Sequence, residues 1–335
     1  MSPYQVFLNS LRSVATLRAY KTFFKKYEEF MGENESDLFC QNDPRLIEEK
    51  IIEFIMSLRE KGLSHSAIRN YVFCVISFYK INDVMLNTTK ISRFMPEYKK
   101  MKQDRAYKHE EIQRLLDIAD ERLRAVVLLL TSTGMRIGAI PDLKLRNLQD
   151  TKITIYEGTK EEYFSFITPE CKEAIDSYLD MRSRYGENIT GDSYLIREQF
   201  DVRKPSEREP KQTVANTLYG KLRDLSNRSG VRDKTLPVTN GFRKFFTTQL
   251  ENSGVNPLHG LMLEGHSTGI RDHYVRPTEQ KMYDEYMKAV DNLTIDPANR
   301  LQRKVETLEI EKSKVDTIAL KLQLLEKKFN KRKGN

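Results

Sequence analysis

The sequence predicts a mainly α-helical protein with one small antiparallel β-sheet, divided between two domains and followed by a C-terminal helical extension. Apolar residues recur at helical spacing along most of the chain, whereas only residues 151–168 alternate as strands do. The chain has 335 residues, more than one domain usually holds. Its segment 96–109 contains five Lys or Arg residues and no Val, Ile or Leu, as expected of a linker.

The composition favours a polyanionic partner and shows no sign of a metal site. Formal net charge is +8 and aromatic residues make up 10% of the chain, a balance that suits a nucleic-acid ligand. The cysteines are scattered and the histidines lack acidic or cysteine partners at ligand spacing, so we expect no metal and no cofactor. No apolar run approaches the ~20 residues of a membrane span. The N-terminus lacks a signal-peptide core, so we expect a cytoplasmic location.

Residues 1–95 are expected to form a helical domain. Amphipathic helices are predicted to begin near Thr16, at Pro44 and at Ser64 or Ser66, each with apolar residues along one stripe. This pattern is also typical of a four-helix bundle with solvated lysines. The basic linker 96–109 either follows a phosphate backbone or acts only as a soluble tether.

A first motif lies near the start of the second domain, which spans residues 110–295. The apolar run Ala125–Leu130 leads into T-S-T-G-M-R-I-G-A-I. Gly134 and Gly138 would let the backbone turn tightly, so that Arg136 points into a cleft. A buried structural arginine is the alternative reading of Arg136.

A second motif closes the same domain. Arg243 opens an amphipathic helix that should stop at Gly254, and Gly265-His266 ends a second, short helix. Tyr274 follows eight residues after His266 and precedes Arg276-Pro277.

Between the two motifs, residues 151–168 read as a β-hairpin. The strands I-T-I-Y and Y-F-S-F-I flank the turn E-G-T-K-E-E, which contains glycine and Lys160. Glu161 and Glu162 stand next to Lys160, so an ordinary surface ion pair is the simplest alternative role for this lysine.

The ordered set Arg136, Arg243, Gly265-His266 and Tyr274 resembles the tyrosine recombinases, the phage-integrase class of site-specific DNA strand-exchange enzymes. Archaeal members look most similar, because of the Arg243-Lys244 pair and the H-Y-x-R-P ending. The resemblance extends over residues 13–290, and it is strong at the two motifs and weak elsewhere.

The resemblance implies metal-free cleavage, exchange and rejoining of DNA for the integration or excision of a mobile element. Tyr274 would attack a phosphodiester and form a 3′-phosphotyrosyl bond, with Tyr283 and Tyr286 as competing candidates. A phenol is a weak nucleophile because its pKa is about 10. The phosphate therefore needs cations, which Arg136 and Arg243 would supply.

Two donors complete the site that the resemblance implies. His266 would donate a hydrogen bond to the phosphate. Lys160 would act as general acid and protonate the departing 5′-oxygen, since an alkoxide is a poor leaving group. Lys152 is the second candidate for this role.

Two positions depart from the family pattern. Asn240 stands where most members carry His or Lys, and an amide can donate a hydrogen bond but cannot take up a proton near pH 7. Ala139 stands where Glu is usual, and its loss implies a compensating contact elsewhere. These departures keep a DNA-binding protein without catalysis as an alternative. A type IB topoisomerase, which would use the same chemistry without choosing a sequence, is the other.

The resemblance also implies that the N-terminal domain lies across one face of double-stranded DNA, and that the protein works as a homotetramer on paired sites. The polar region 186–210, which includes Arg197, Arg203, Lys204 and Arg208, reads as a DNA-facing loop or an insertion. The remaining candidate DNA contacts are basic residues of the helical domain and the linker: Arg18, Lys21, Lys25, Arg69, Lys99, Lys100, Lys102 and Arg105.

Residues 296–335 predict a heptad-like helix with a basic tail. Its apolar stripe runs from Leu301 to Phe329 in steps of three and four, interrupted at Lys312. Such a helix docks either on its own domain or on a neighbouring subunit.

Overall fold

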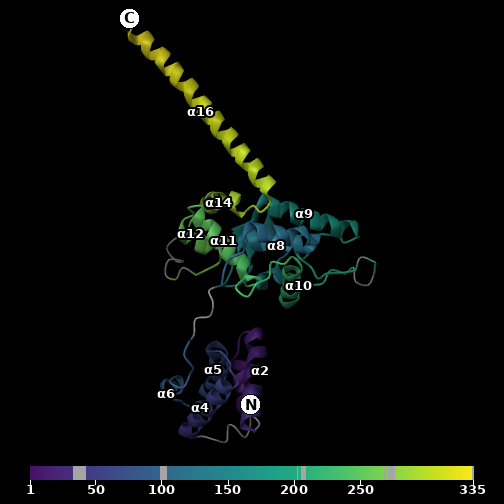
Figure 1. Ribbon diagram of the computed structural model, residues 1–335, viewed down its shortest axis with the longest axis vertical. Coiled ribbons are helices and arrows are strands. Elements are labelled where there is room, and N and C mark those ends of the chain that lie inside the picture. The colour runs from purple at the N-terminus through teal and green to yellow at the C-terminus, as the bar shows by residue number, and fades with distance from the viewer. Residues whose placement is uncertain are drawn as a thin grey trace. The chain divides into compact units, whose positions relative to one another are not determined.

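The computed structural model describes residues 1–32, 43–98, 104–201, 203–204, 209–267, 269 and 276–333 (Figure 1). The chain divides into two compact units, Met1–Met101 and Lys102–Asn335. The observed secondary structure confirms the predicted class, mainly helical with one small antiparallel sheet. None of the helices in the described ranges combines the length and the apolar character needed to cross a bilayer.

The N-terminal unit is a bundle in which one helix, α5, packs against three others. Side-chain oxygens of Ser13, Asp43 and Ser64 accept backbone N–H groups at the starts of α2, α4 and α5. Its core is aromatic, with Phe24 and Phe78 rings 4.6 Å apart. The helices are α1 (Pro3–Ser10), α2 (Val14–Met31), α4 (Pro44–Glu60), α5 (His65–Ile81) and α6 (Thr88–Ser92).

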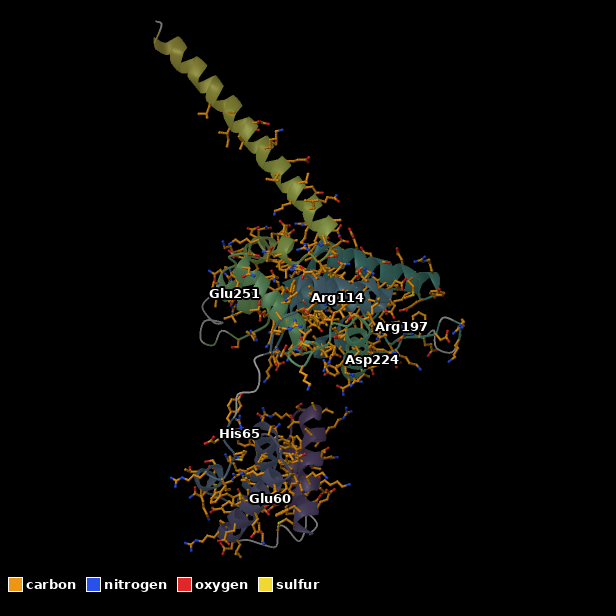
Figure 2. All side chains as sticks on the ribbon, viewed as in Figure 1. Glu60, His65, Arg114, Arg197, Asp224 and Glu251 are labelled. Atoms are coloured by element: carbon orange, nitrogen blue, oxygen red, sulfur yellow. The ribbon has the colours of Figure 1, made fainter. Side chains whose placement is uncertain are left out.

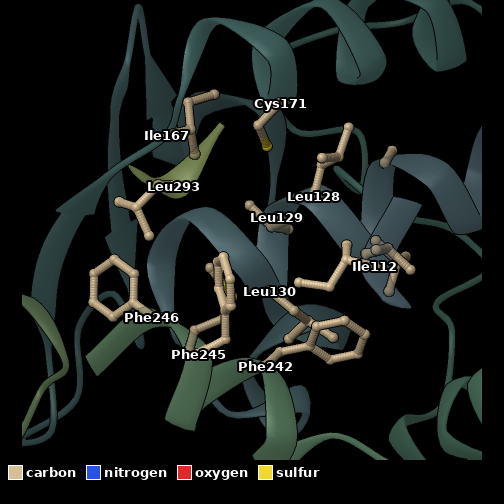
Figure 3. Packing of buried hydrophobic residues seen from close by; sticks show 14 of the residues in the cluster. Ile112, Leu128, Leu129, Leu130, Ile167, Cys171, Phe242, Phe245, Phe246 and Leu293 are labelled. Carbon is tan, nitrogen blue, oxygen red and sulfur yellow. The ribbon is translucent and has the colours of Figure 1, made fainter. Parts of the chain in front are cut away.

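Helix α8 (Glu121–Thr133) forms the centre of the second unit, and every residue from Ala125 to Thr133 is buried. Figure 3 shows this helix between Cys171 of α9 on one side and Phe242, Phe245 and Phe246 of α11 on the other. This burial explains the continuous apolar run of the sequence. The helices around α8 are α7 (His109–Asp117), α9 (Pro169–Arg184), α10 (Ala215–Arg228), α11 (Asn240–Asn252), α12 (Pro257–Leu263), α14 (Glu279–Met287) and α15 (Val290–Leu293).

The predicted hairpin is present and gains a third strand. Strands β1 (Leu148–Gln149), β2 (Lys152–Ile155) and β3 (Tyr163–Phe166) pair antiparallel in the order β1-β2-β3. Ile153 is opposite Ser165, and Ile155 is opposite Tyr163. β1 has two residues, too few for an alternating pattern to reveal it.

Part of the predicted linker belongs to the second unit. Tyr107 is buried, and its ring stacks on Phe242 with the centroids 4.3 Å apart. The Arg105 guanidinium forms salt bridges with Glu111 at 2.8 Å and Asp233 at 2.5 Å. These two salt bridges anchor the segment around Arg105 to the second unit.

Of the two readings of region 186–210, the DNA-facing loop does not apply to Arg197, which is buried. Its side chain is 1% exposed and pairs with Glu187, which also pairs with Arg182 at 2.5 Å. Burial alone would raise the pKa of Glu187, but the hydrogen bonds from both arginines outweigh it and lower that pKa. Arg203 and Lys204 are exposed, and Arg208 lies outside the described residues.

The predicted C-terminal helix is α16 (Pro297–Lys333). Its start is held by α15, where Arg303 pairs with Asp291 at 2.9 Å. Beyond that point its stripe residues Val305, Leu308, Val315 and Leu322 are 46–63% exposed.

Candidate active site

A left-handed turn after α8 positions Arg136. Gly134 has a φ of 61°, and its N–H donates to the Leu130 carbonyl at 3.0 Å. A Cβ at Gly134 would lie 2.4 Å from the Phe246 ring, so only glycine fits. Arg136 follows as an exposed residue at the start of the 3₁₀ helix Ile137–Asp142. Gly138, which we expected to share the turn, has no left-handed φ.

Arg243 connects the ends of two helices. It lies on the first turn of α11, and its Nη1 donates to the Gly134 carbonyl at 2.7 Å. Its Nη2 donates to the Glu264 carbonyl at 2.7 Å and lies 3.0 Å from Nε2 of His266. These contacts fix the guanidinium beside the turn that carries Arg136.

His266 directly follows a second constrained glycine. Gly265 has a φ of 67°, and a Cβ there would lie 2.4 Å from the Tyr163 ring of β3. Burial and the nearby Arg243 lower the pKa of His266, against an opposing effect of Glu264. Burial and Arg243 thus favour the neutral imidazole in the DNA-free protein.

The two candidate lysines have different surroundings. Lys160 lies in the turn between β2 and β3, where Gly158 has a φ of 74°. Within the described residues, its ammonium has no salt bridge with Glu161 or Glu162. Lys152 instead pairs with Glu279 at 2.6 Å and lies 5.1 Å above the Phe164 ring.

Two adjoining cavities bring the predicted residues together, with Arg136 and His266 lining both. The larger, of about 850 Å³, is also lined by Lys160, Arg276, Tyr156 and Tyr163. The smaller, of about 620 Å³, is also lined by Asn240, Arg243, Lys244 and Glu264. Five Lys or Arg residues therefore line the two cavities, together with four carboxylates, Glu161, Glu162, Asp104 and Glu264.

Tyr274 lies outside the described residues, as do Lys99, Lys100 and Lys102. Ser267 and Arg276, which flank the segment containing Tyr274, both line the larger cavity. The candidate contacts Arg18, Lys21, Lys25 and Arg69 are exposed on α2 and α5.

The alternative nucleophiles on α14 are poorly placed. Tyr286 is buried, its hydroxyl donates to the Ser132 carbonyl at 2.9 Å, and burial raises its pKa well above 10. The Tyr283 ring packs against Phe166 at 5.2 Å. Neither tyrosine lines either cavity.

Sequence reasoning missed four residues of this site. Arg276 belongs to the H-Y-x-R-P ending, so its position in the motif was an available signal. Tyr156 and Tyr163 read only as strand residues, and burial raises the pKa of Tyr163 to about 12. Glu264 stands at the end of a predicted helix, where an acidic residue usually faces solvent, yet its side chain is buried, with 3% exposed.

Comparison with known proteins gives consistent matches. The model of the phage integrase family matches residues 105–280. Tyrosine recombinase XerA of Pyrococcus furiosus is 24% identical over 294 residues, which cover 83% of this chain and 89% of the relative.

Solved structures share the fold at lower sequence identity. The Tn1549 transposon integrase in complex with transposon right end DNA is 19% identical with a TM-score of 0.57, covering 86% of this chain and 99% of that one. A lambda integrase tetramer bound to a Holliday junction is 14% identical with a TM-score of 0.58, covering 83% and 78%.

Proposed function

Because this chain belongs to the phage integrase family and is by class a tyrosine recombinase, we propose that it cleaves and rejoins DNA through a 3′-phosphotyrosyl bond to Tyr274. The observation that carries the proposal is the convergence of Arg136, Arg243, His266 and Lys160 on two adjoining cavities. These residues come from four separate parts of the chain, so their meeting is not a consequence of sequence proximity.

The arginines bind and activate the scissile phosphate. Arg136 is exposed and lines both cavities, so its guanidinium is accessible to a phosphate oxygen. Arg243 is held by the carbonyls of Gly134 and Glu264, which orient it before DNA arrives. A preorganised cation stabilises the charge that develops in the transition state without further reorganisation.

The nucleophile and the leaving group are activated in different ways. The Tyr274 phenol becomes a better nucleophile as charge on the phosphate is neutralised, and the bond from Tyr274 to phosphorus replaces the bond to the 5′-oxygen. Lys160 delivers a proton to that oxygen as it leaves. Rejoining reverses both steps, so no external energy source is required.

The proposed substrate is double-stranded DNA. The proposed assembly is a tetramer that holds two DNA sites together. The lambda integrase relative is a tetramer on a Holliday junction, and the Tn1549 relative is a transposon integrase bound to transposon DNA. By analogy we assign this protein to the integration or excision of a mobile element as a tetramer.

A covalent adduct tests the proposed chemistry. Target sites would first be selected by the protein from a pool of random duplexes. Each selected site would then carry a nick near the cleavage position, so that the cleaved fragment diffuses away and rejoining cannot occur. We expect a denaturation-resistant protein–DNA adduct, formed in the presence of a metal chelator, whose DNA-linked peptide contains Tyr274. Absence of an adduct on every selected site would favour a DNA-binding protein without catalysis. Relaxation of plasmids that lack a selected site would favour a topoisomerase.

Helix α16 is the proposed connection between protomers. Its exposed stripe repeats with the spacing of a coiled coil, and Lys312 on that stripe weakens the seam as reversible assembly requires. Deleting residues 299–335 should leave cleavage of a single nicked site intact but reduce paired-site complexes and recombination, as measured by sedimentation with DNA.

Point variants distinguish the contribution of the apolar stripe to assembly from that of the rest of α16. Leu308→Asp with Val315→Asp should reproduce the effect of the deletion. Ser313→Asp with Thr317→Asp places the same charges on exposed positions off the stripe and should assemble normally. Unchanged assembly of the truncated protein would exclude this role for α16.

A further inference from the structure

A buried carboxylate lies next to Arg243 and His266. Glu264 directly follows α12 and is 3% exposed. Its Oε1 accepts a hydrogen bond from the Thr247 hydroxyl at 2.8 Å. Its Oε2 lies 3.4 Å from Nδ1 of His266 and 3.7 Å from Nη2 of Arg243. A buried carboxylate is costly unless it is paired, so these neighbours define its role.

The backbone of the same residue reinforces the arrangement. The Glu264 carbonyl accepts a hydrogen bond from Nη2 of Arg243 at 2.7 Å, so side chain and main chain hold one guanidinium. Ala139, in the turn region after Arg136, is buried and offers no carboxylate to these cations. Glu264 therefore supplies an acidic contact to both Arg243 and His266.

We propose that Glu264 is a positioning residue for strand cleavage, whose carboxylate attracts the Nδ1 side of His266 and Nη2 of Arg243 by its charge, so that both residues donate to the scissile phosphate. This inference rests on the proposed function and deepens it. Glu264 itself touches neither DNA nor the reacting atoms.

The hydrogen bonds of the imidazole explain why a carboxylate is needed. Arg243 has only donors, so Nε2 of His266 accepts from Nη2 in the DNA-free protein and the ring proton resides on Nδ1. Among the described residues Nδ1 is buried without a hydrogen-bond partner, and Oε2 of Glu264 is the carboxylate oxygen beside it, 3.4 Å away. When a phosphate binds, Nε2 must carry a proton to donate to it. A shift of the ring proton from Nδ1 to Nε2 would leave a lone pair facing the Glu264 carboxylate, so uptake of a second proton from solvent is favoured instead. The resulting imidazolium lies between two anions, Glu264 and the phosphate, which both stabilise it.

Other charged groups around His266 also influence how easily its imidazole becomes protonated. Arg243 and Arg136 disfavour the imidazolium, whereas Glu264 favours it. Across the larger cavity lie two further cations, Lys160 and Arg276, and two further carboxylates, Glu161 and Glu162. Among the described residues, Glu264 is the one whose carboxylate lies within 4 Å of the His266 ring.

The variant that tests this proposal is Glu264→Gln. It keeps the side-chain shape and an oxygen that accepts from the Thr247 hydroxyl, but it removes the negative charge of the carboxylate. Its His266 pKa, measured by NMR of labelled histidine and assigned with His266→Gln, should fall relative to the unaltered protein. Single-turnover cleavage should slow about tenfold above that pKa if the shift is one unit. The deficit should disappear at lower pH, where both proteins carry the imidazolium.

Controls separate positioning from folding. Glu251→Gln makes the same chemical change at an exposed position on α11 (Figure 2) and should alter neither the His266 pKa nor cleavage. Glu264→Asp keeps the charge and should recover part of the pH profile. DNA affinity should stay near that of the unaltered protein in every variant, since other cations bind the backbone.

The NMR arm needs no catalysis, so it tests the inference separately from the proposed function. The unaltered protein should show the Nδ1–H tautomer of His266 at high pH, a result that does not depend on any variant folding. An Nε2–H tautomer, or an unchanged His266 pKa in Glu264→Gln, would overturn the positioning role. A missing covalent adduct would overturn the proposed function instead.

Discussion

Replacing Tyr274 with phenylalanine is expected to abolish the covalent protein–DNA adduct completely. The substitution removes one oxygen, the atom proposed to bond to phosphorus, and leaves the cations around the phosphate in place. Affinity for the target duplex should therefore change little, because it depends on many phosphate contacts. Adduct formation on the nicked substrate and equilibrium binding at the same salt concentration would measure the two effects separately.

Single-oxygen deletions at other tyrosines provide the matched controls. Tyr283→Phe and Tyr286→Phe should still form the adduct, since neither side chain lines the cavities, although Tyr286→Phe loses a buried hydrogen bond and should be less stable. Tyr156→Phe and Tyr163→Phe matter more, because both rings line the larger cavity. An adduct that survives in Tyr274→Phe and vanishes in one of these variants would reassign the nucleophile.

The fold was largely predictable wherever local chemistry determines it. Helix starts at Pro44 and after Ser64 follow from capping residues, and the hairpin follows from alternation around a glycine turn. Arg197 was misread because a polar, Gly-flanked stretch usually faces solvent. Its burial depends on Glu187, ten residues earlier, and no local pattern reveals a buried ion pair of this kind.

The site was predictable only in part. Spacing alone could not bring Arg136 and Arg243 together, since their proximity depends on the Gly134 carbonyl and on the contact between Gly134 and Phe246. The resemblance to a family supplied that expectation. Glu264 could not be found in this way, because its burial and its contact with Thr247 arise from packing between α11 and α12.

Lys160→Ala is expected to slow cleavage of normal DNA by about 10²–10⁴-fold, the usual contribution of a general acid. The same variant should cleave a substrate with sulfur at the 5′-bridging position at nearly the normal rate. A thiolate leaves without a proton, because thiols ionise near a pKa of about 8.5. Single-turnover cleavage of the two substrates would give the ratio that isolates proton donation from binding.

Lys152 provides the discriminating control, because it lies on the same hairpin and carries the same charge. Its ammonium is paired with Glu279 and stacked on Phe164, so Lys152→Ala should cost stability rather than proton transfer. Its cleavage rate should fall by a similar factor on the oxygen and sulfur substrates, if it falls at all. Rescue by sulfur in Lys152→Ala, without rescue in Lys160→Ala, would show that the general acid lies on β2 and that the turn lysine only contacts DNA.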